Sequence, residues 1–276
     1  MLQAAGGAPD WVNAENAMSG SNTSDFRVSS LRQACATCGL NQLCLPMSLS
    51  EADIEQLEAI VERKRPLERG EHLYRSGDDF RAIYAVRSGS IKTYTTTENG
   101  EEQVTGFHLP GELVGLDAIN SWVHPCSASA LETTSICELP FGQLEHLAAD
   151  IPGLQRQLLR LMSKEIFADQ EMLFAMARRS AEERLAMLLL SLSDRFGRRG
   201  LSASRFRLPM ARSDLGNYLG LAPETMSRLF RRFSEQGWLK AEGREIQLLD
   251  FNALGRLSGR PAEDTAETGR QSDGTD

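Results

Sequence analysis

Long apolar runs are missing from this chain of 276 residues, since no stretch approaches the about 18 consecutive apolar residues that a membrane span needs. Residues 1–30 also lack a basic start followed by an apolar block, so no secretory signal is expected. Both absences predict a cytoplasmic protein that does not act at a membrane. The sequence also has no phosphate loop, nucleophile elbow or paired acid–base motif, so it does not predict an enzyme.

Cysteine is scarce, with five residues in the whole chain. Disulfide frameworks are not expected in a reducing compartment, so clustered cysteines indicate metal or redox chemistry. Cys35, Cys38 and Cys44 follow the pattern C-x2-C-x5-C. Three thiolates at this spacing can share one metal ion or cluster, and Cys126 and Cys137 are the candidates for a fourth ligand. Spacing alone leaves zinc and an iron–sulfur cluster open, whereas a redox dithiol, as in a dithiol oxidoreductase, would need a preceding strand.

The residue pattern changes several times along the chain and predicts an α+β protein with separate parts. Residues 1–30 are rich in small and polar residues and are expected to form a disordered tail. Residues 31–150 combine the cysteine run with glycine-punctuated short strands, including a tight hairpin at Asn99-Gly100, and predict a domain built on a small all-β barrel or roll. Residues 181–258 predict a winged helix-turn-helix domain, and residues 259–276 an acidic tail.

Local signals predict shorter elements inside these domains. Ser50 and Asp53 form a capping pair for a short helix that reaches about Val61. A short strand is expected over residues 206–210, and a turn at Glu242-Gly243 is expected to join the two strands of the wing.

One long helix is predicted between the two domains, within residues 151–180. Pro152 suits a first helical turn, and no Pro or Gly follows Gly153 before Arg178. Such a helix either packs on its own domain or forms a parallel coiled-coil dimer, and the dimer is favoured. Asp169 falls near the seam, where a charge is costly unless it is paired or neutralised. The expected dimer-interface residues are Leu158, Met162, Ile166, Asp169 and Leu173.

Residues 212–230 fit a helix-turn-helix. Gly216 is small where the two helices must approach, Gly220 can adopt the positive φ of the turn, and Pro223 suits the first turn of the second helix. Residues 205–246 hold eight arginines and lysines against five acidic residues, a net +3 on a chain of net charge −8. This basic module on an acidic protein predicts contact with double-stranded DNA through phosphates.

The N-terminal end of the second helix carries Glu224, Thr225, Ser227 and Arg228, at the positions that reach base edges in the major groove. An arginine can bond O6 and N7 of guanine, a glutamate can accept from N4 of cytosine, and the hydroxyls can contact a thymine methyl or donate a bond. The alternative is an exposed Glu224–Arg228 ion pair at i,i+4. Inside this turn pattern, base reading is favoured.

A set of motifs between about residues 35 and 257 together resembles the CRP/FNR superfamily of bacterial regulators, and within it the oxygen-responsive FNR group with its ANR relatives. The motifs are the C-x2-C-x5-C run from Cys35, PGELVG at 110–115, ALET at 130–133, CELPF at 137–141, AEERL at 181–185, GNYLGL at 216–221 and ETMSR at 224–228.

The resemblance implies that residues 31–150 form a sensory domain with a cupin-like or cyclic-nucleotide-binding-like β-roll. It also implies a dimerisation helix and an oxygen-labile 4Fe–4S cluster. Its implied ligands are Cys35, Cys38, Cys44 and Cys137, the last because it lies in the CELPF motif, whereas Cys126 matches no family ligand. The cyclic-nucleotide branch binds its phosphate through an Arg-Ser pair. The corresponding stretch here, residues 124–127, reads His-Pro-Cys-Ser, so no cyclic nucleotide is expected.

The resemblance also implies how such a regulator works. Under anaerobic conditions the cluster is intact, the protein forms a homodimer, and Glu224, Ser227 and Arg228 read TTGAT-like half-sites in an inverted repeat. Genes of anaerobic metabolism are then activated or repressed through contact with RNA polymerase. Oxygen destroys or converts the cluster and lowers DNA binding.

Overall fold

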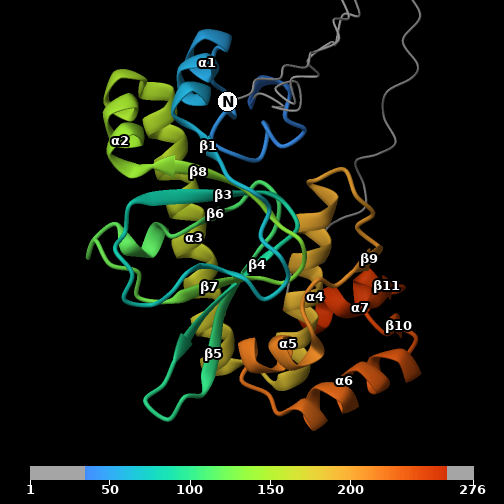
Figure 1. Cartoon of the computed structure of the whole chain (residues 1–276). Coiled ribbons are helices and arrows are strands. Elements are labelled where there is room, and N and C mark those ends of the chain that lie inside the picture. The colour runs from blue at the N-terminus through green and yellow to red at the C-terminus, as the bar shows by residue number, and fades with distance from the viewer. Residues whose placement is uncertain (1–34, 260–276) are drawn as a thin grey trace, which may run out of the picture. The chain divides into compact units, whose positions relative to one another are not determined.

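The computed structural model describes residues 35–259, and these form the expected α+β architecture (Figure 1). The helices are α1 (Glu51–Ile60), α2 (Phe141–Asp150), α3 (Pro152–Arg178), α4 (Ala181–Gly197), α5 (Arg212–Tyr218), α6 (Pro223–Glu235) and α7 (Phe251–Leu257), with short 3-10 turns η2 (Cys35–Thr37) and η3 (Leu116–Ala118). The strands are β1 (Glu62–Arg63), β2 (His72–Tyr74), β3 (Ala82–Ser88), β4 (Ile91–Thr96), β5 (Glu102–His108), β6 (Leu113–Val114), β7 (Ser127–Ala130), β8 (Ser135–Pro140), β9 (Arg205–Arg207), β10 (Leu239–Glu242) and β11 (Glu245–Leu248). The tail predicted at 1–30, and nearly all of the one at 259–276, lie outside the described residues.

The β-roll consists of two four-stranded antiparallel sheets, with strand orders β1-β8-β3-β6 and β2-β7-β4-β5. Strand β8 is held on both sides, because Cys137 pairs with Arg63 of β1 and with Ala85 of β3. A cysteine at this register position is therefore fixed by the sheet.

The helices α1 and α2 and the start of α3 share one core with the first sheet. Leu57, Leu139, Leu144 and Leu154 are buried in this core together with Leu45 from the segment that follows the cysteine run. The predicted cap of α1 is confirmed, since the Ser50 hydroxyl accepts a hydrogen bond from the Asp53 amide at 3.2 Å.

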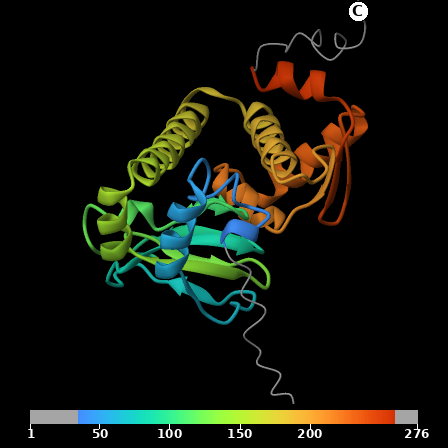
Figure 2. The ribbon, with the colours of Figure 1, turned by 90° about the horizontal axis from the view of Figure 1, so that it is seen from above.

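The long helix is confirmed at Pro152–Arg178. It is joined to α4 by the short link Arg179–Ser180, and Figure 2 shows α3 and α4 as separate helices on either side of this link. Ser180 and Glu183 form a complete capping box, which explains why a new helix begins here. In the range 35–259, no helix is long and apolar enough to cross a membrane.

The DNA-binding domain contains the predicted helix-turn-helix, formed by α5 and α6, and the predicted wing, formed by β10 and β11. Gly220 has a φ of 61°, as the turn requires. A Cβ added to Gly216 would lie 2.9 Å from both the Leu221 carbonyl oxygen and Met226 Cγ, so only glycine fits where these helices approach. Pro223 is the first residue of α6.

Three details differ from the sequence-based expectations. Strand β9 spans Arg205–Arg207 instead of residues 206–210, because Pro209 has no N–H to donate to a sheet ladder. The β4–β5 hairpin turns through residues 97–101, a longer connection than a two-residue Asn99-Gly100 turn. Helices α2 and α7 were not predicted from the sequence pattern.

A partly buried ion-pair cluster joins the β-roll to the DNA-binding domain. The Glu112 carboxylate, just before β6, accepts from Arg195 Nε at 2.9 Å and from Arg199 at 2.7 Å, both on or next to the last turn of α4. Burial opposes ionisation of Glu112, but the two arginines and the Leu109 amide lower its pKa to about 2. A second contact lies at the β4–β5 hairpin, where the Asn217 side chain accepts from the Val104 amide at 2.6 Å and donates to the Glu102 carbonyl at 2.7 Å.

The Glu112 cluster predicts a specific pH dependence of stability. A carboxyl whose pKa falls from 4.5 to about 2 on folding stabilises the protein above pH 4.5, and this contribution is lost as the pH falls toward 2. Glu112→Gln should lower the free energy of unfolding at pH 7 by about 2–3 kcal/mol and flatten the loss of stability between pH 5 and 3. Thermal unfolding at a series of pH values measures both effects. Glu98→Gln, at an exposed hairpin position, is the control, and parallel pH profiles for the parent and Glu112→Gln would contradict the prediction.

Candidate metal centre and nucleic-acid interface

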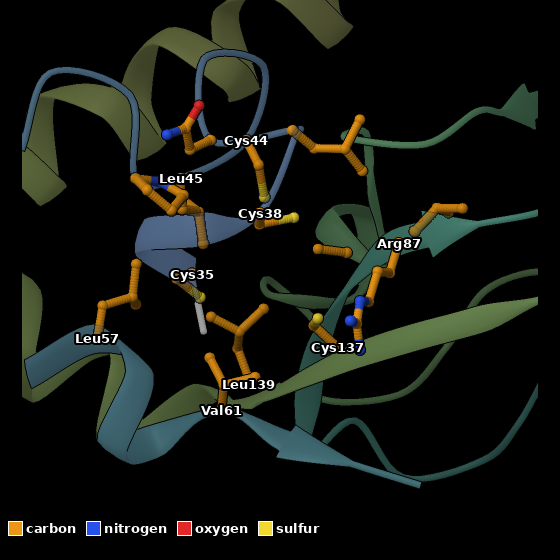
Figure 3. Close-up of a pocket in the computed structure, with 14 residues that line it drawn as sticks. Cys35, Cys38, Cys44, Leu45, Leu57, Val61, Arg87, Cys137 and Leu139 are labelled. Atoms are coloured by element: carbon orange, nitrogen blue, oxygen red, sulfur yellow. The ribbon is translucent and has the colours of Figure 1, made fainter. Parts of the chain in front are cut away.

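The four cysteines expected as ligands line one pocket (Figure 3). Cys35, Cys38 and Cys44 come from the N-terminal segment around η2, and Cys137 comes from β8 on the other side of the pocket. The pocket holds about 440 Å³ of space, including its opening to solvent. Its other walls are largely apolar, and they include Leu45, Leu57, Val61, Ala85, Val86 and Leu139.

Glu58 anchors the cysteine segment at its N-terminal end. Its carboxylate accepts from the Cys35 amide at 2.7 Å and from both terminal nitrogens of Arg63, at 2.5 and 2.9 Å. Burial opposes ionisation, but the hydrogen bonds from Arg63 and Cys35 lower the pKa of Glu58 to about 2. Sequence reasoning missed both residues, because no local motif marks a glutamate at the end of α1 as the partner of a cysteine 23 positions earlier.

The thiols of the pocket are electrostatically coupled. Burial raises the pKa of Cys44 to about 12, and burial together with the Glu58 carboxylate raises the pKa of Cys35. Charge on Cys137 raises both values further, which places this thiol within electrostatic range of the other two. Burial also raises the pKa of Cys137, opposed by Arg63 and Arg87. A metal bound by Cys35, Cys44 and Cys137 would have to displace the protons of these thiols.

The donor set suits an anionic, thiolate-bound cluster. Four thiols face one apolar pocket, and thiolates are the usual ligands of iron–sulfur clusters. Arg63 and Arg87 add positive charge beside Cys137. Within the described residues, no three His, Cys, Asp or Glu side chains lie close enough together to hold a single metal ion.

Cys126 lies elsewhere. It is buried in the core of the second sheet, with 5% of its surface exposed, and its thiol donates to the Asp117 carboxylate at 3.2 Å. Burial, with Asp117, raises its pKa to about 12. Of the two candidates for a fourth ligand, the structure brings Cys137 to the pocket and keeps Cys126 away from it.

The predicted recognition residues lie on the exposed side of α6. Glu224, Ser227 and Arg228 are exposed and Thr225 is half-buried, whereas Met226 and its apolar neighbours face the core. Among the described residues no ion pair joins Glu224 to Arg228, and the Arg228 guanidinium instead donates to the Thr225 hydroxyl at 3.2 Å. The side chains of Glu224 and Arg228 are therefore not paired with each other and can both contact DNA bases. The Thr225 hydroxyl can orient the Arg228 guanidinium.

The predicted dimer-interface residues lie along α3 and differ in exposure, and Leu158 packs against the core shared with the first sheet. Ile166 and Leu173 have 56% and 72% of their surfaces exposed, Leu158 and Met162 are half-buried, and Asp169 is exposed. Neighbouring Leu159, Phe167 and Phe174 are also exposed. Burial raises the pKa of Asp169, and His108 opposes this shift. A helix with so much apolar surface in contact with water is typical of a helix that packs against a partner.

Comparison with known proteins agrees with this architecture. Residues 64–151 match the model of the cyclic nucleotide-binding domain, and residues 183–257 match the Crp-like helix-turn-helix domain. The transcriptional activator protein FnrA of Stutzerimonas stutzeri is 52% identical over 235 residues, which cover 85% of this chain and 96% of that protein. The chain belongs to the FNR group of the CRP/FNR superfamily.

Other relatives support the same assignment. The fumarate and nitrate reduction regulatory protein of Escherichia coli K12 is 49% identical over 225 residues, which cover 82% of this chain and 90% of that protein. The solved structure of FixK2 from Bradyrhizobium japonicum is 29% identical with a TM-score of 0.66, covering 72% of this chain and 97% of FixK2. This FNR-group protein is therefore a DNA-binding transcription regulator and not an enzyme.

The exposed position of Arg228 predicts that it reads one base pair. Arg228→Ala should remove the preference at that base pair, with a loss of about 1–3 kcal/mol on the matched operator and little loss on an operator already changed there. Binding titrations on a set of single-substituted operators measure this. Arg231→Ala, an exposed arginine on the next turn paired with Glu235 at 3.5 Å, is the control and should keep the base preference. Equal weakening by Arg228→Ala on every operator would instead assign Arg228 to phosphate.

Proposed function

We propose that this chain is an oxygen-responsive regulator that binds a 4Fe–4S cluster through Cys35, Cys38, Cys44 and Cys137. The observation that supports this most directly is the gathering of these four thiols around one pocket, although Cys137 is 93 residues beyond Cys44. When bound, the cluster would supply the reactivity toward oxygen.

Ligation by these residues would tie the N-terminal segment to strand β8. Because β8 is paired on both sides, the cysteine segment is the part that moves when ligation is lost. That segment packs on α1 and on the start of α3, since Leu45, Leu57 and Leu154 share a core. The ligation state of the pocket can therefore reach the dimerisation helix through direct packing.

The proposed active form is a homodimer joined along α3. Two weak half-site contacts become one strong bidentate contact when two helix-turn-helix domains are linked, so dimerisation controls operator affinity. The proposed operators are inverted repeats of TTGAT-like half-sites, read by Glu224, Ser227 and Arg228 with Thr225 beside them. Asp169 at the seam keeps the dimer weak, because it places like charges near each other where they are partly desolvated.

The proposed regulator also has an expected compartment and expected partners. The regulator acts in the cytoplasm, where thiols stay reduced, and it contacts RNA polymerase to activate or repress genes of anaerobic metabolism. No cyclic nucleotide is expected to bind, since residues 124–127 hold no arginine for a cyclic phosphate. His124 is instead buried and stacked on Tyr74 at a ring distance of 3.6 Å.

The visible spectrum of the full chain, purified without oxygen, tests the cluster. A broad band at about 400 nm that bleaches or shifts on exposure to air is expected from a thiolate-bound iron–sulfur cluster. The Cys137→Ser variant should lose most of this band, whereas the matched control Cys126→Ser should keep it. A colourless protein with stoichiometric zinc would overturn the oxygen-sensing proposal and leave DNA binding intact.

The Asp169→Ala variant tests whether the charge of Asp169 weakens the proposed dimer. Removing the charge from the seam should lower the dimer dissociation constant in air by about tenfold, corresponding to about 1.4 kcal/mol. Sedimentation analysis in air measures the dimer fraction. The control is Glu171→Ala, which removes an exposed carboxylate from the same helix two residues later, off the predicted seam. An Asp169→Ala protein that stays as monomeric in air as the parent would show that this charge does not oppose dimerisation.

A further inference from the structure

One polar side chain of α3 reaches the cysteine segment. Gln157 has only 3% of its surface exposed, and its Nε2 donates to the Cys44 carbonyl oxygen at 3.2 Å. Its Oε1 lies 3.5 Å from a terminal nitrogen of Arg160 on the next turn. The backbone of a proposed cluster ligand is thus hydrogen-bonded to the dimerisation helix across 113 positions of sequence.

Gln157 lies on the side of α3 that faces away from the predicted seam. The predicted seam positions 158, 162, 166, 169 and 173 follow one another in steps of three and four, which is the spacing of a coiled-coil seam. On the repeat set by positions 162, 166, 169 and 173, Gln157 falls at the outermost position, and it is nevertheless buried. What buries it is its own chain, so one helix presents one side to a second protomer and the opposite side to the cysteine segment.

Apolar contacts surround this hydrogen bond. Leu45, the residue after Cys44, is fully buried in the same core as Leu154. A Cβ added to Gly153 would lie 3.0 Å from Leu49 Cδ2, so the chain after Cys44 packs tightly on the first turn of α3. These contacts are not directional, whereas the amide bond of Gln157 fixes the position of one peptide unit relative to the helix.

We propose that Gln157 is a positioning residue that transmits the ligation state of Cys44 to α3, and this inference rests on the proposed cluster and dimer. If the Cys44 peptide unit shifts when ligation is lost, the buried amide of Gln157 loses its acceptor unless the helix moves too. An unpaired buried donor is costly, so the two movements are coupled. The first turns of α3 then adopt the dimer-competent position only when Cys44 is held in its ligated position.

The bond can be removed without breaking the turn that carries Cys44. The Cys44 carbonyl also accepts from the Met47 amide at 3.2 Å, so the loop keeps a partner when Gln157 is replaced. Gln157→Leu places an apolar side chain, shorter by one bond, at this buried position and removes the amide that donates to Cys44. Gln143→Leu makes the same chemical change at an exposed position of α2 and is the matched control.

The experiment measures the dimer dissociation constant of the full-length protein, without oxygen, with and without reconstituted iron and sulfide. For the parent and for Gln143→Leu, cluster loading should lower this constant by a similar factor. Gln157→Leu should take up the same amount of cluster, judged by visible absorbance, but its loaded form should dimerise about tenfold more weakly, while its unloaded form is unchanged. An unchanged response in Gln157→Leu, with normal loading, would overturn the inference.

Hydrogen exchange of the unmodified protein gives a second test that needs no variant. Backbone amides in residues 152–162 should exchange more slowly when the cluster is present, and equal exchange in both states would overturn the inference even if Gln157→Leu does not load. A parent protein that takes up no iron–sulfur cluster overturns the proposed function. Cluster-dependent dimerisation that persists in Gln157→Leu overturns only the role of Gln157.

Discussion

Cys137 lies in a strand that is paired on both sides, whereas Cys35, Cys38 and Cys44 lie on a segment with no strand of its own, and the rest of the proposed switch depends on bringing the two together. The sheet fixes Cys137 through Arg63 and Ala85. The segment is held by contacts at its two ends, with Glu58 at Cys35 and Gln157 at Cys44. In the proposed switch, a ligand shared by strand β8 and the cysteine segment changes the position of the segment, because β8 is paired on both sides and the described part of the segment belongs to no sheet.

A nearly balanced monomer–dimer equilibrium would let a small site control a large assembly. In the proposed dimer, the exposed apolar side chains of α3 favour association, and Asp169 among them opposes it. When two opposing contributions nearly cancel, a change of one or two kcal/mol at the start of the helix moves the monomer–dimer equilibrium by about tenfold or more. A strongly stable dimer would not respond to a change of that size.

Local signals predicted much of the fold. Helix periodicity and Pro152 predicted the bounds of α3, a capping pair predicted α1, and Gly216, Gly220 and Pro223 predicted the helix-turn-helix, because each of these acts within one or two helical turns. Strand β9 was predicted too long, because Leu208 and Met210 are apolar at alternate positions as in a strand, although Pro209 between them has no N–H to donate to a sheet.

The contacts that the sequence did not predict join residues that lie far apart in the chain. The Cys35–Glu58, Cys44–Gln157 and Glu112–Arg195 contacts join residues that are 23, 113 and 83 positions apart, and no spacing rule relates such pairs. The cysteine run itself was evident, but which of Cys126 and Cys137 completes the set could be chosen from the sequence only through the family motif. In the structure the choice follows from the sheet, since β8 faces the cysteine segment and β7 begins one residue after Cys126 in the other sheet.

The DNA-binding domain is held to the rest of the protein by packing and hydrogen bonds as well as by the two-residue link after α3. Val104, Phe107, Leu109 and Leu131 of the β-roll belong to the same core as α4, α5 and α6, and Glu112 holds the end of α4. Rotating the domain about the link would therefore expose apolar surface and separate Glu112 from Arg195 and Arg199. In the proposed switch, a change in the cysteine segment reaches the first turns of α3 through the bond between Cys44 and Gln157, and from there the proposed dimer seam and the operator.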